Sequence, residues 1–351
     1  MKNNFVAIMA GGIGSRFWPA SNETKPKQFL DILGIGKSLL RATYERFSTA
    51  FPVENIFIVT NKSYNHLVMD QIPEIPLTNI INEPSRNNTG PSVAYTAFRI
   101  SAVNPDANII MAPSDHIILK ENAFVNIVKQ ALNLADNSEM ILTLGIPPDR
   151  PDTGYGYIEL SEKPIDLELK LYKVSSFKEK PDLETAIGYL KTDKYIWNAG
   201  LFIFKAKTVL SAFKKYSPGI YNILNEGKSV YNTADEKEFI EKNYPLTTNI
   251  SMDYAILEKA DNIYTIVSDI SWSDLGTWNS LHNFIHRDKD DNAAIDATGV
   301  FINSHGNIVK APKTKSVFIR DLNEFIIVDE NDILLIYPIN KEQEIRDIHK
   351  C

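Results

Sequence analysis

The first 145 residues alternate short apolar runs with longer stretches in which apolar side chains recur at helical spacing. The apolar runs predict strands over residues 5–10, 56–60, 79–82, 108–112 and 140–145. The intervening stretches predict helices over residues 38–51, 61–72, 92–103 and 123–135, with Ser38 as a helix cap. Strands and helices that alternate in this way form right-handed crossovers and a mostly parallel sheet. The chain therefore predicts an α/β fold whose ligands gather beyond the carboxyl ends of the strands.

A glycine-rich segment directly follows the first predicted strand. It contains Gly11, Gly12, Gly14, Ser15 and Arg16. Residues without a Cβ atom let backbone N–H groups approach an anion closely and let the chain take positive φ angles. Arg16 adds a forked cation suited to phosphate oxygens, and Lys27 adds a mobile point charge. The segment therefore predicts a phosphate-binding loop.

Two familiar phosphate-binding motifs do not fit this loop. A dinucleotide fingerprint that starts at Gly12 requires glycine at the position of Phe17. A P-loop that ends in Gly36, Lys37 and Ser38 requires glycine at the position of Asp31. Both motifs are excluded, and we interpret residues 36–38 as a turn that leads into a helix.

The string GGIGSRFWP from residue 11, with PKQF from residue 26, resembles the signature of sugar-nucleotide pyrophosphorylases, and of their mannose-1-phosphate guanylyltransferases in particular. The resemblance extends from residue 5 to about residue 350. It implies a Rossmann-like nucleotidyltransferase domain with a mixed central sheet. It also implies a transferase that moves GMP from GTP to α-D-mannose 1-phosphate and so makes GDP-mannose and pyrophosphate. A pyrophosphorylase for another base and sugar, or a non-catalytic regulatory subunit that binds a nucleotide sugar, stays open.

The resemblance assigns the nucleotide to the glycine loop and to the segment after strand 79–82. In the family the arginine and the lysine contact the triphosphate, so Arg16 and Lys27 would hold it and the departing pyrophosphate. The Glu83 carboxylate could accept both N–H donors of guanine, a pair that adenine lacks. The nucleotide-binding residues implied in this way are Gly11, Gly12, Gly14, Ser15, Arg16, Lys27, Glu83, Asn88 and Thr89.

Two aspartates that lie far apart in the sequence are the candidate metal ligands. Asp115 follows strand 108–112, and Asp274 lies in a second strand-to-helix turn. Two carboxylates beside a triphosphate suit Mg²⁺, which prefers few protein oxygens and completes its shell with phosphate and water. In the resembled family the aspartates of the motifs S-D-H and W-x-D-x-G bind the metal, and these motifs match residues 114–116 and 272–276 (W-S-D-L-G) here. Taken singly, each aspartate is equally a turn or helix-cap residue.

The sugar phosphate is assigned to motifs beyond residue 154. The residues that match the family's sugar motifs are Gly156, Glu179, Lys180, Asn198 and Asp253. Lys180 would bind the incoming phosphate, whose oxygen attacks the α-phosphate of GTP in line. The resemblance thus implies Arg16, Lys27, Asp115 and Lys180 as catalytic residues. Gly156 could equally mark a strand bulge, and Asp253 could serve the N-terminus of a helix.

Beyond residue 154 the pattern predicts strands 154–158, 174–177, 201–204 and 263–267, and helices 183–190, 207–216, 235–242 and 252–260. Residues 197–200 are predicted as a turn and residues 287–292 as a solvated linker. The predicted division is a catalytic domain over residues 1–286 and a small β-rich, β-helix-like domain over residues 287–351. Its predicted strands are 300–303, 307–310, 316–319, 325–328 and 333–337.

Composition narrows the class of protein further. The formal net charge of −7 disfavours a nucleic-acid or anionic-membrane partner, which would require clustered excess Lys and Arg. No apolar run approaches membrane-spanning length, and residues 5–10 are too few for a signal-peptide core. The only cysteine is Cys351, and the six histidines show no zinc motif. We therefore expect a cytoplasmic protein, for which a homo-oligomer stays open.

Overall fold

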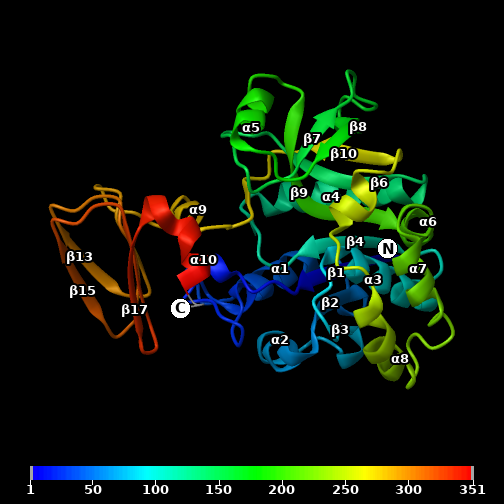
Figure 1. The fold of residues 1–351 in the computed structure, drawn as a ribbon, viewed down its shortest axis with the longest axis horizontal. Coiled ribbons are helices and arrows are strands. Elements are labelled where there is room, and N and C mark those ends of the chain that lie inside the picture. Colours follow the sequence, from blue (N-terminus) through cyan, green and yellow to red (C-terminus); the bar gives the residue numbers. More distant parts are fainter. Residues whose placement is uncertain (1–2, 349–351) are drawn as a thin grey trace. The chain divides into compact units, whose positions relative to one another are not determined.

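The computed structural model describes residues 3–348, which form two compact units (Figure 1). Unit 1 comprises the chain up to Gly11 together with Tyr44–Pro113 and Ile118–Trp272. Unit 2 comprises Gly12–Thr43, Ser114–Ile117 and the chain from Ser273 onward. The division into domains 1–286 and 287–351 stays a prediction, because compactness in space does not test which segments fold on their own.

Unit 1 is built on a nine-stranded sheet with the strand order β3-β2-β1-β4-β9-β6-β10-β8-β7. Its strands are β1 (Asn4–Ala10), β2 (Ile56–Asn61), β3 (Ile80–Glu83), β4 (Asn108–Pro113), β6 (Ile141–Ile146), β7 (Tyr157–Leu160), β8 (Leu171–Lys178), β9 (Tyr195–Lys205) and β10 (Ile263–Val267). Nearly continuous burial of β1, β2 and β4 explains their unbroken apolar sequences, because both faces of the sheet are covered.

The sheet is mixed, as the family resemblance implied. Strands β3, β2, β1 and β4 are parallel, but β9 runs antiparallel between β4 and β6. Strands β6 and β10 are also parallel to each other, so the expectation of a mostly parallel sheet fails only at the antiparallel pairs that β9 and β8 make. The prediction of a turn at residues 197–200 is wrong, because these residues lie inside β9. The register of β9 against β6 shifts there and Gly200 has a φ of 67°, so the polar and glycine signals mark an irregularity within a strand.

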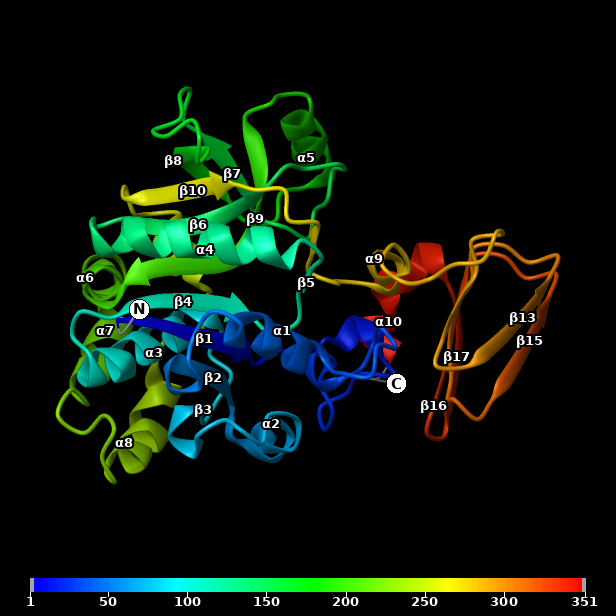
Figure 2. The ribbon, with the colours of Figure 1, turned by 180° about the vertical axis from the view of Figure 1, so that it is seen from behind.

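The two ends of this sheet differ. At one end β7 pairs with β8 and also with β9, so the last strands close into a ring. At the other end β3 pairs only with β2. Among the described residues, β3 is therefore the strand of this sheet whose outer side no other strand covers (Figures 1 and 2).

Helices cover the sheet of unit 1, and most of them match the predicted ranges. They are α1 (Leu39–Ser48), which continues from unit 2, α2 (Asn65–Gln71), α3 (Thr89–Val103), α4 (Glu121–Asp136), α5 (Leu183–Leu190), α6 (Ala206–Tyr216), α7 (Pro218–Asn225), α8 (Glu236–Asn243) and the five-residue π-helix η7 (Asp253–Leu257). Ser38 caps α1 as predicted, since its hydroxyl accepts from the Arg41 N–H at 3.1 Å. Helix α7 was not predicted, although Pro218 at its first position is a helix-start signal. Helices α3, α6 and α7 pack together over the main apolar core, which includes Phe98, Phe204 and Phe213.

Unit 2 contains the glycine loop and the β-rich end of the chain. Its strands are β12 (Ala293–Ile295), β13 (Thr298–Ile302), β14 (Ile308–Lys310), β15 (Ser316–Arg320), β16 (Phe325–Glu330) and β17 (Ile333–Pro338). Strands β12, β14 and β16 are parallel and β17 is antiparallel to β16, while β13 and β15 form a separate parallel pair. The five predicted strands are present, and β12 was missed. Short helices α9 (Trp278–His282) and α10 (Ile345–Ile348) complete the described part of the unit.

Two stacked asparagines organise the interior of these strands. The Asn292 Oδ1 accepts from the N–H and the Nδ2 of Asn307 at 3.1 and 2.9 Å. The Asn307 Oδ1 in turn accepts from the Phe325 N–H at 3.0 Å. Both asparagines are buried, and these bonds satisfy their polar atoms. The prediction of a fully solvated linker over residues 287–292 is therefore wrong at Asn292, which begins this ladder.

None of the helices described in residues 3–348 combines the length and the apolar character needed to cross a membrane. Cys351 lies outside the described residues.

Candidate functional site

The glycine loop of unit 2 has the backbone geometry that its sequence predicts. Gly14 has a φ of 73°, and a Cβ atom at this position would lie 2.4 Å from the Cβ of Lys27. The Lys27 N–H donates to the Ile13 carbonyl at 3.1 Å, which holds the two segments at this separation. Gly12 is exposed, and a Cβ there would meet no atom within 4 Å. Glycine is thus required by packing at residue 14, whereas at residue 12 it leaves backbone open to a ligand.

Lys27 gathers three segments of unit 2 around one ammonium group. Its Nζ lies 2.7 Å from the Asp115 Oδ2 and donates to the carbonyls of Asp274 and Leu275, both at 2.9 Å. An ammonium has three N–H donors, so every donor of this buried lysine has a partner. The structure therefore brings together Lys27, Asp115 and Asp274, although Lys27 holds protein oxygens in the positions where phosphate oxygens were expected.

The turn that carries Asp274 is closed by local hydrogen bonds. The Asp274 Oδ1 accepts from the Gly276 N–H at 2.9 Å, and the Ser273 hydroxyl accepts from the Leu275 N–H at 3.1 Å. Leu275 has a φ of 47°, a left-handed conformation that is costly for a leucine. Its carbonyl receives one of the Lys27 donors and its side chain is buried, so packing and Lys27 both hold this conformation.

The Asp115 carboxyl is held in its ionised form. Burial by itself would raise its pKa, but the charges of Lys27 and His116 and the hydrogen bond from Lys27 outweigh burial, so the pKa is lower than its ordinary value. About a third of the side chain is exposed, at 31%. A partly exposed, ionised carboxylate beside a buried cation is able to bind a metal ion without first losing a proton.

Arg16 lies in the short helix η1 (Ser15–Phe17), directly after the glycine loop. The neighbouring Phe17 is fully buried and its ring lies 5.0 Å from that of Trp278, so η1 is firmly anchored. The Nε atom of Arg16 is buried and has no hydrogen-bond partner among the described residues. A guanidinium donor in this state lacks an acceptor, which an anionic ligand would supply.

In unit 1, Glu83 ends β3 and is 9% exposed. The hydroxyl of the fully buried Tyr244 donates to its Oε1. A Cβ at Gly11 would lie 3.7 Å from its Oε2, so this second oxygen faces the last glycine of unit 1. Burial raises the pKa of the Glu83 carboxyl, and hydrogen bonds from Tyr244 and Ser92 act in the opposite direction.

Asn88 and Thr89 form the start of α3. Asn88 has a φ of 69°, and its side chain accepts from the Thr89 N–H at 2.9 Å. The Thr89 hydroxyl accepts from the Met252 N–H at 2.8 Å, while the Asn87 Nδ2 donates to the Thr247 carbonyl at 2.9 Å. The segment that follows Glu83 is thus tied at two points to the segment that leads to Asp253.

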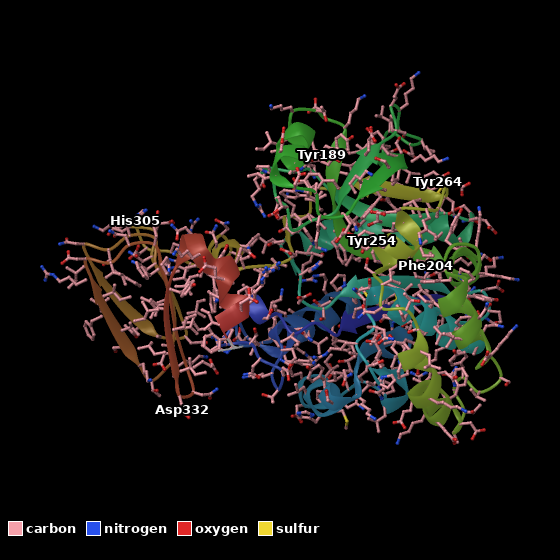
Figure 3. The ribbon with its side chains drawn as sticks, in the orientation of Figure 1. Tyr189, Phe204, Tyr254, Tyr264, His305 and Asp332 are labelled. Carbon is pink, nitrogen blue, oxygen red and sulfur yellow. The ribbon has the colours of Figure 1, made fainter. Side chains whose placement is uncertain are left out.

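Asn198 and Asp253 lie in direct contact. The Asn198 Nδ2 donates to the Asp253 Oδ1 at 3.1 Å, and the Asn198 Oδ1 accepts from the Thr143 hydroxyl at 2.7 Å. These bonds fix which end of the amide faces Asp253. Asp253 is partly buried in η7, whereas its neighbour Tyr254 is 45% exposed (Figure 3). The short π-helix therefore turns one polar group inward at this position.

The remaining predicted sugar residues surround Asp253. The Lys180 ammonium pairs with the Glu179 carboxylate, whose side chain is 8% exposed. A Cβ at Gly156 would lie 2.6 Å from the Glu179 Oε2 and 2.8 Å from the Phe177 ring, so only glycine fits there. Burial and then the charge of Glu179 raise the pKa of Asp253 to about 6. This cluster combines carboxylates, an amide and one mobile cation, which suits a hydroxylated anion.

Comparisons with known proteins place the chain in a family. A family model described as Nucleotidyl transferase matches residues 6–291. The chain belongs to the nucleotidyl transferase family. The mannose-1-phosphate guanylyltransferase 2 of Escherichia coli O157:H7 is 34% identical to it, over 98% of this chain and 72% of that protein. The mannose-1-phosphate guanylyltransferase of Klebsiella pneumoniae is 32% identical over 97% of this chain and 72% of that protein.

A solved structure agrees with this assignment. The crystal structure of a mannose-1-phosphate geranyltransferase from Thermus thermophilus superimposes with a TM-score of 0.88 and 25% identity, over 99% of this chain and 98% of that chain. The family resemblance inferred from the glycine loop is therefore confirmed. The nucleotidyl transferase fold and its mixed sheet are confirmed as well.

Three residues of this nucleotidyl transferase hold candidate residues in place but were not predicted from the sequence. Tyr244 binds Glu83, Thr143 binds Asn198, and Leu275 accepts from Lys27. Tyr244 and Thr143 lie in segments without a motif, so no sequence signal identifies them. Leu275 lies inside the W-S-D-L-G motif, but its role depends on a backbone carbonyl, which residue type does not reveal.

Proposed function

We propose that this protein transfers GMP from GTP to α-D-mannose 1-phosphate and releases pyrophosphate and GDP-mannose. The observation that carries the proposal is the whole-chain similarity to two proteins named mannose-1-phosphate guanylyltransferase, at 34% and 32% identity. The residue chemistry is compatible with it, because in-line phosphoryl chemistry requires alignment and charge neutralisation and no covalent nucleophile from the protein.

The triphosphate is proposed to bind at the glycine loop of unit 2. Gly11, Gly12, Gly14 and Ser15 would offer backbone N–H groups. The unpartnered Nε of Arg16 supports this assignment, since a phosphate oxygen would satisfy it. Lys27 would reach a phosphate only after it releases one of its three protein acceptors, so we infer that its donors are exchanged on substrate binding.

A Mg²⁺ ion is proposed to bind at Asp115 and Asp274. Within the described residues, no group of three or more His, Cys, Asp or Glu side chains could hold a metal ion. Two aspartates in segments joined by Lys27 nevertheless fit Mg²⁺, whose remaining ligands are ordinarily phosphate oxygens and water. When bound, the ion would supply charge neutralisation on phosphate oxygens. The lowered pKa of Asp115 keeps its carboxylate ready for this role.

The sugar phosphate is proposed to bind in unit 1. Asn198, Asp253 and Glu179 would bind hydroxyls, Gly156 would allow close approach, and Lys180 would bind the phosphate. Lys180 is 58% exposed and can turn from Glu179 toward a ligand. The catalytic set is thus proposed as Arg16, Lys27, Asp115 and Lys180.

Guanine is proposed to bind beside Glu83, Asn88 and Thr89. One carboxylate oxygen of Glu83 already accepts from Tyr244, and Ser92 also hydrogen-bonds to this carboxylate, so only part of its acceptor capacity remains for a base. The acceptor positions that remain on the Glu83 carboxylate can accept one strong N–H hydrogen bond or be shared between two N–H donors. We infer that base selection depends on backbone groups of this segment in addition to Glu83.

Three further expectations remain proposals. The parallel strands β12, β14 and β16 and the ladder of Asn292 and Asn307 support a β-helix-like C-terminal domain. Replacement of Asn307 by Leu tests this, because it would leave buried backbone groups without partners and lower the stability of the ladder. A cytoplasmic location is proposed from the composition and the single cysteine, and a homo-oligomer stays open.

The deciding experiment measures pyrophosphate release by the purified protein with Mg²⁺, for GTP, UTP, ATP and dTTP each paired with mannose 1-phosphate and glucose 1-phosphate. We expect turnover with GTP and mannose 1-phosphate, and loss of turnover when Mg²⁺ is removed by chelation. Equal turnover of UTP and GTP would indicate a pyrophosphorylase for another base. Nucleotide-sugar binding without turnover of any pair would instead identify a regulatory subunit.

A further inference from the structure

A pocket lies in unit 1 beside the open edge of β3. Its volume is about 690 Å³, and none of the residues assigned above to GTP, metal or mannose 1-phosphate lines it. Strand β3 lies between α2 and α8 in both views, and both helices contribute to the lining (Figures 1 and 2). The pocket is therefore a separate feature of the same unit.

One wall of the pocket is a fixed pair of buried charges. The Arg99 Nε lies 2.9 Å from the Glu236 Oε1, and the two side chains are 11% and 9% exposed. Arg99 also donates to the carbonyls of Thr78 and Ile80 at 3.0 and 3.3 Å, and the Tyr95 hydroxyl donates to Glu236 at 2.6 Å. Because each buried charge has its partner, this wall needs no counter-ion from a ligand.

Two amide oxygens in the lining lack partners. The Oδ1 atoms of Asn65 and Asn82 are buried, and neither has a hydrogen-bond partner among the described residues. A buried acceptor without a donor destabilises the unliganded protein. Both atoms can only accept and both are shielded from solvent, so a ligand would reach them after the two amides turn toward the pocket, and the complementary ligand is one that donates hydrogen bonds from at least two positions.

The charges at the mouth of the pocket also limit the ligand. Lys62 at the start of η4 (Lys62–Tyr64) pairs with Glu241 of α8 at 3.2 Å, and both residues line the pocket. Lys237 is a further cation of the lining. With the other charges paired, the pocket suits a ligand that is neutral or carries one anionic group.

We propose that this pocket binds a sugar, either free or as a monophosphate, whose hydroxyl groups donate to Asn65 and Asn82. Sugar hydroxyls match the two unpartnered acceptors, and the apolar Ile80 and Ile240 offer surface for the C–H face of the ring. In the monophosphate, the anionic group would lie at Lys237. The proposal does not depend on which nucleotide the enzyme uses.

The pocket is connected to Glu83 by direct contacts. Glu236 in its wall accepts from Tyr95, whose ring centroid lies 5.9 Å from that of Tyr244. Tyr244 donates to Glu83, and Asn82 is the residue before Glu83. If Glu83 binds the base as proposed above, a sugar in the pocket will change the KM for GTP. This consequence rests on the proposed function, whereas binding itself does not.

The test is calorimetric titration of the full chain with methyl α-D-mannoside, which has no phosphate and cannot act as a substrate. We expect binding that weakens at least tenfold in Asn82→Ala and in Asn65→Ala. Asn198→Ala, in the proposed substrate site, is expected to leave this binding unchanged. Thermal melts identify any variant that fails to fold, and Asn65 on α2 provides the second variant if Asn82→Ala does.

A second titration with mannose 6-phosphate distinguishes the two sources of sugar. Tighter binding than the mannoside, with the advantage removed by Lys237→Ala, would identify a sugar monophosphate, and equal binding would identify a free sugar. Absence of binding at tens of millimolar mannoside, or binding lost in Asn198→Ala but kept in Asn82→Ala, would overturn the proposal. Either result leaves the pyrophosphate-release assay unaffected, so failure here is distinct from failure of the proposed reaction.

Discussion

The ammonium of Lys27 lies 2.7 Å from the carboxylate of Asp115, and the lysine is only 4% exposed. Removing such a charge from water is unfavourable unless fixed oxygens replace the water. Asp115 and the carbonyls of Asp274 and Leu275 supply these oxygens from two other segments of unit 2. Lys27 is therefore a structural centre of this cluster as well as a candidate substrate ligand.

Replacement of Asp115 by Asn separates these two roles. We expect pyrophosphate release to fall by roughly 10²-fold or more, since an amide neither binds Mg²⁺ well nor offers the same charge. The melting temperature should stay within a few degrees, because the amide oxygen still accepts from Lys27 and the side chain is partly exposed. Asp115→Ala, which removes the acceptor, should lose about 1–3 kcal/mol more. A large loss of stability in the Asp115→Asn variant would show that Asp115 is chiefly structural.

Gly14 and Gly12 form a matched pair for the loop. Gly14→Ala places a Cβ 2.4 Å from that of Lys27 at a positive φ, so we expect a loss of at least about 1–2 kcal/mol of unfolding free energy. Gly12→Ala meets no atom within 4 Å and should keep its stability. If the triphosphate lies on this loop, Gly12→Ala should nevertheless raise the KM for GTP. Urea unfolding and steady-state kinetics test both statements, and an unchanged KM would argue against a phosphate at Gly12.

Tyr244→Phe tests the support of Glu83. Loss of the hydroxyl leaves a buried carboxylate oxygen without its donor, which should cost about 1–3 kcal/mol and raise the KM for GTP. Tyr231→Phe is the control, because it removes a buried hydroxyl that donates to the Leu224 carbonyl at 2.6 Å and does not contact Glu83. Tyr231→Phe should lower stability without changing the KM. Equal KM values in the two variants would remove Glu83 from the nucleotide site.

The raised pKa of Asp253 predicts a pH dependence of stability. Its value of about 6 in the folded protein lies above the ordinary 3.8, so between these pH values the folded state binds more protons than the unfolded state. Stability contributed by the protonated form is therefore lost as pH rises from about 4 to 6, by at most about 3 kcal/mol.

Asp253→Asn removes this titration while it keeps an acceptor for Asn198. We expect the variant to be more stable than the wild type at pH 7.5 and to lose that advantage at pH 4. Urea unfolding at both pH values measures the difference. An advantage that is equal at the two pH values would show that Asp253 does not titrate in this range.

The spacing of apolar residues predicted most helices and strands of unit 1. The predictions that failed concern strand pairing between segments far apart in the chain. Burial on both faces gives β1, β2 and β4 an apolar signature that is visible in any short window. The place of β9 between β4 and β6 depends on segments far apart in the chain, and its internal Gly200 resembles a turn signal. Periodicity identifies strands but does not specify their neighbours.

The identity of the candidate residues could be predicted from the sequence, but their hydrogen-bonding partners could not. The glycine loop, Asp115 and Asp274 carry motifs, so their positions could be read from the sequence. Tyr244 contacts Glu83 across 161 positions, and no motif marks it. The sequence likewise shows that Lys27 is a cation near a phosphate loop, but it does not show that protein oxygens already occupy all its donors. That depends on the three-dimensional placement of carbonyl groups.

The open side of β3 has a consequence for the behaviour of the protein in concentrated solution. An uncovered strand edge is a template on which another chain can add a strand, and such additions lead to aggregation. Here Arg99 occupies the carbonyls of Thr78 and Ile80, and its partner Glu236 belongs to α8. Since the opposite end of the sheet closes on itself through β7 and β9, this ion pair lies at the start of the one strand whose outer side is uncovered in the described part of the sheet, and it leaves less room there for an added strand.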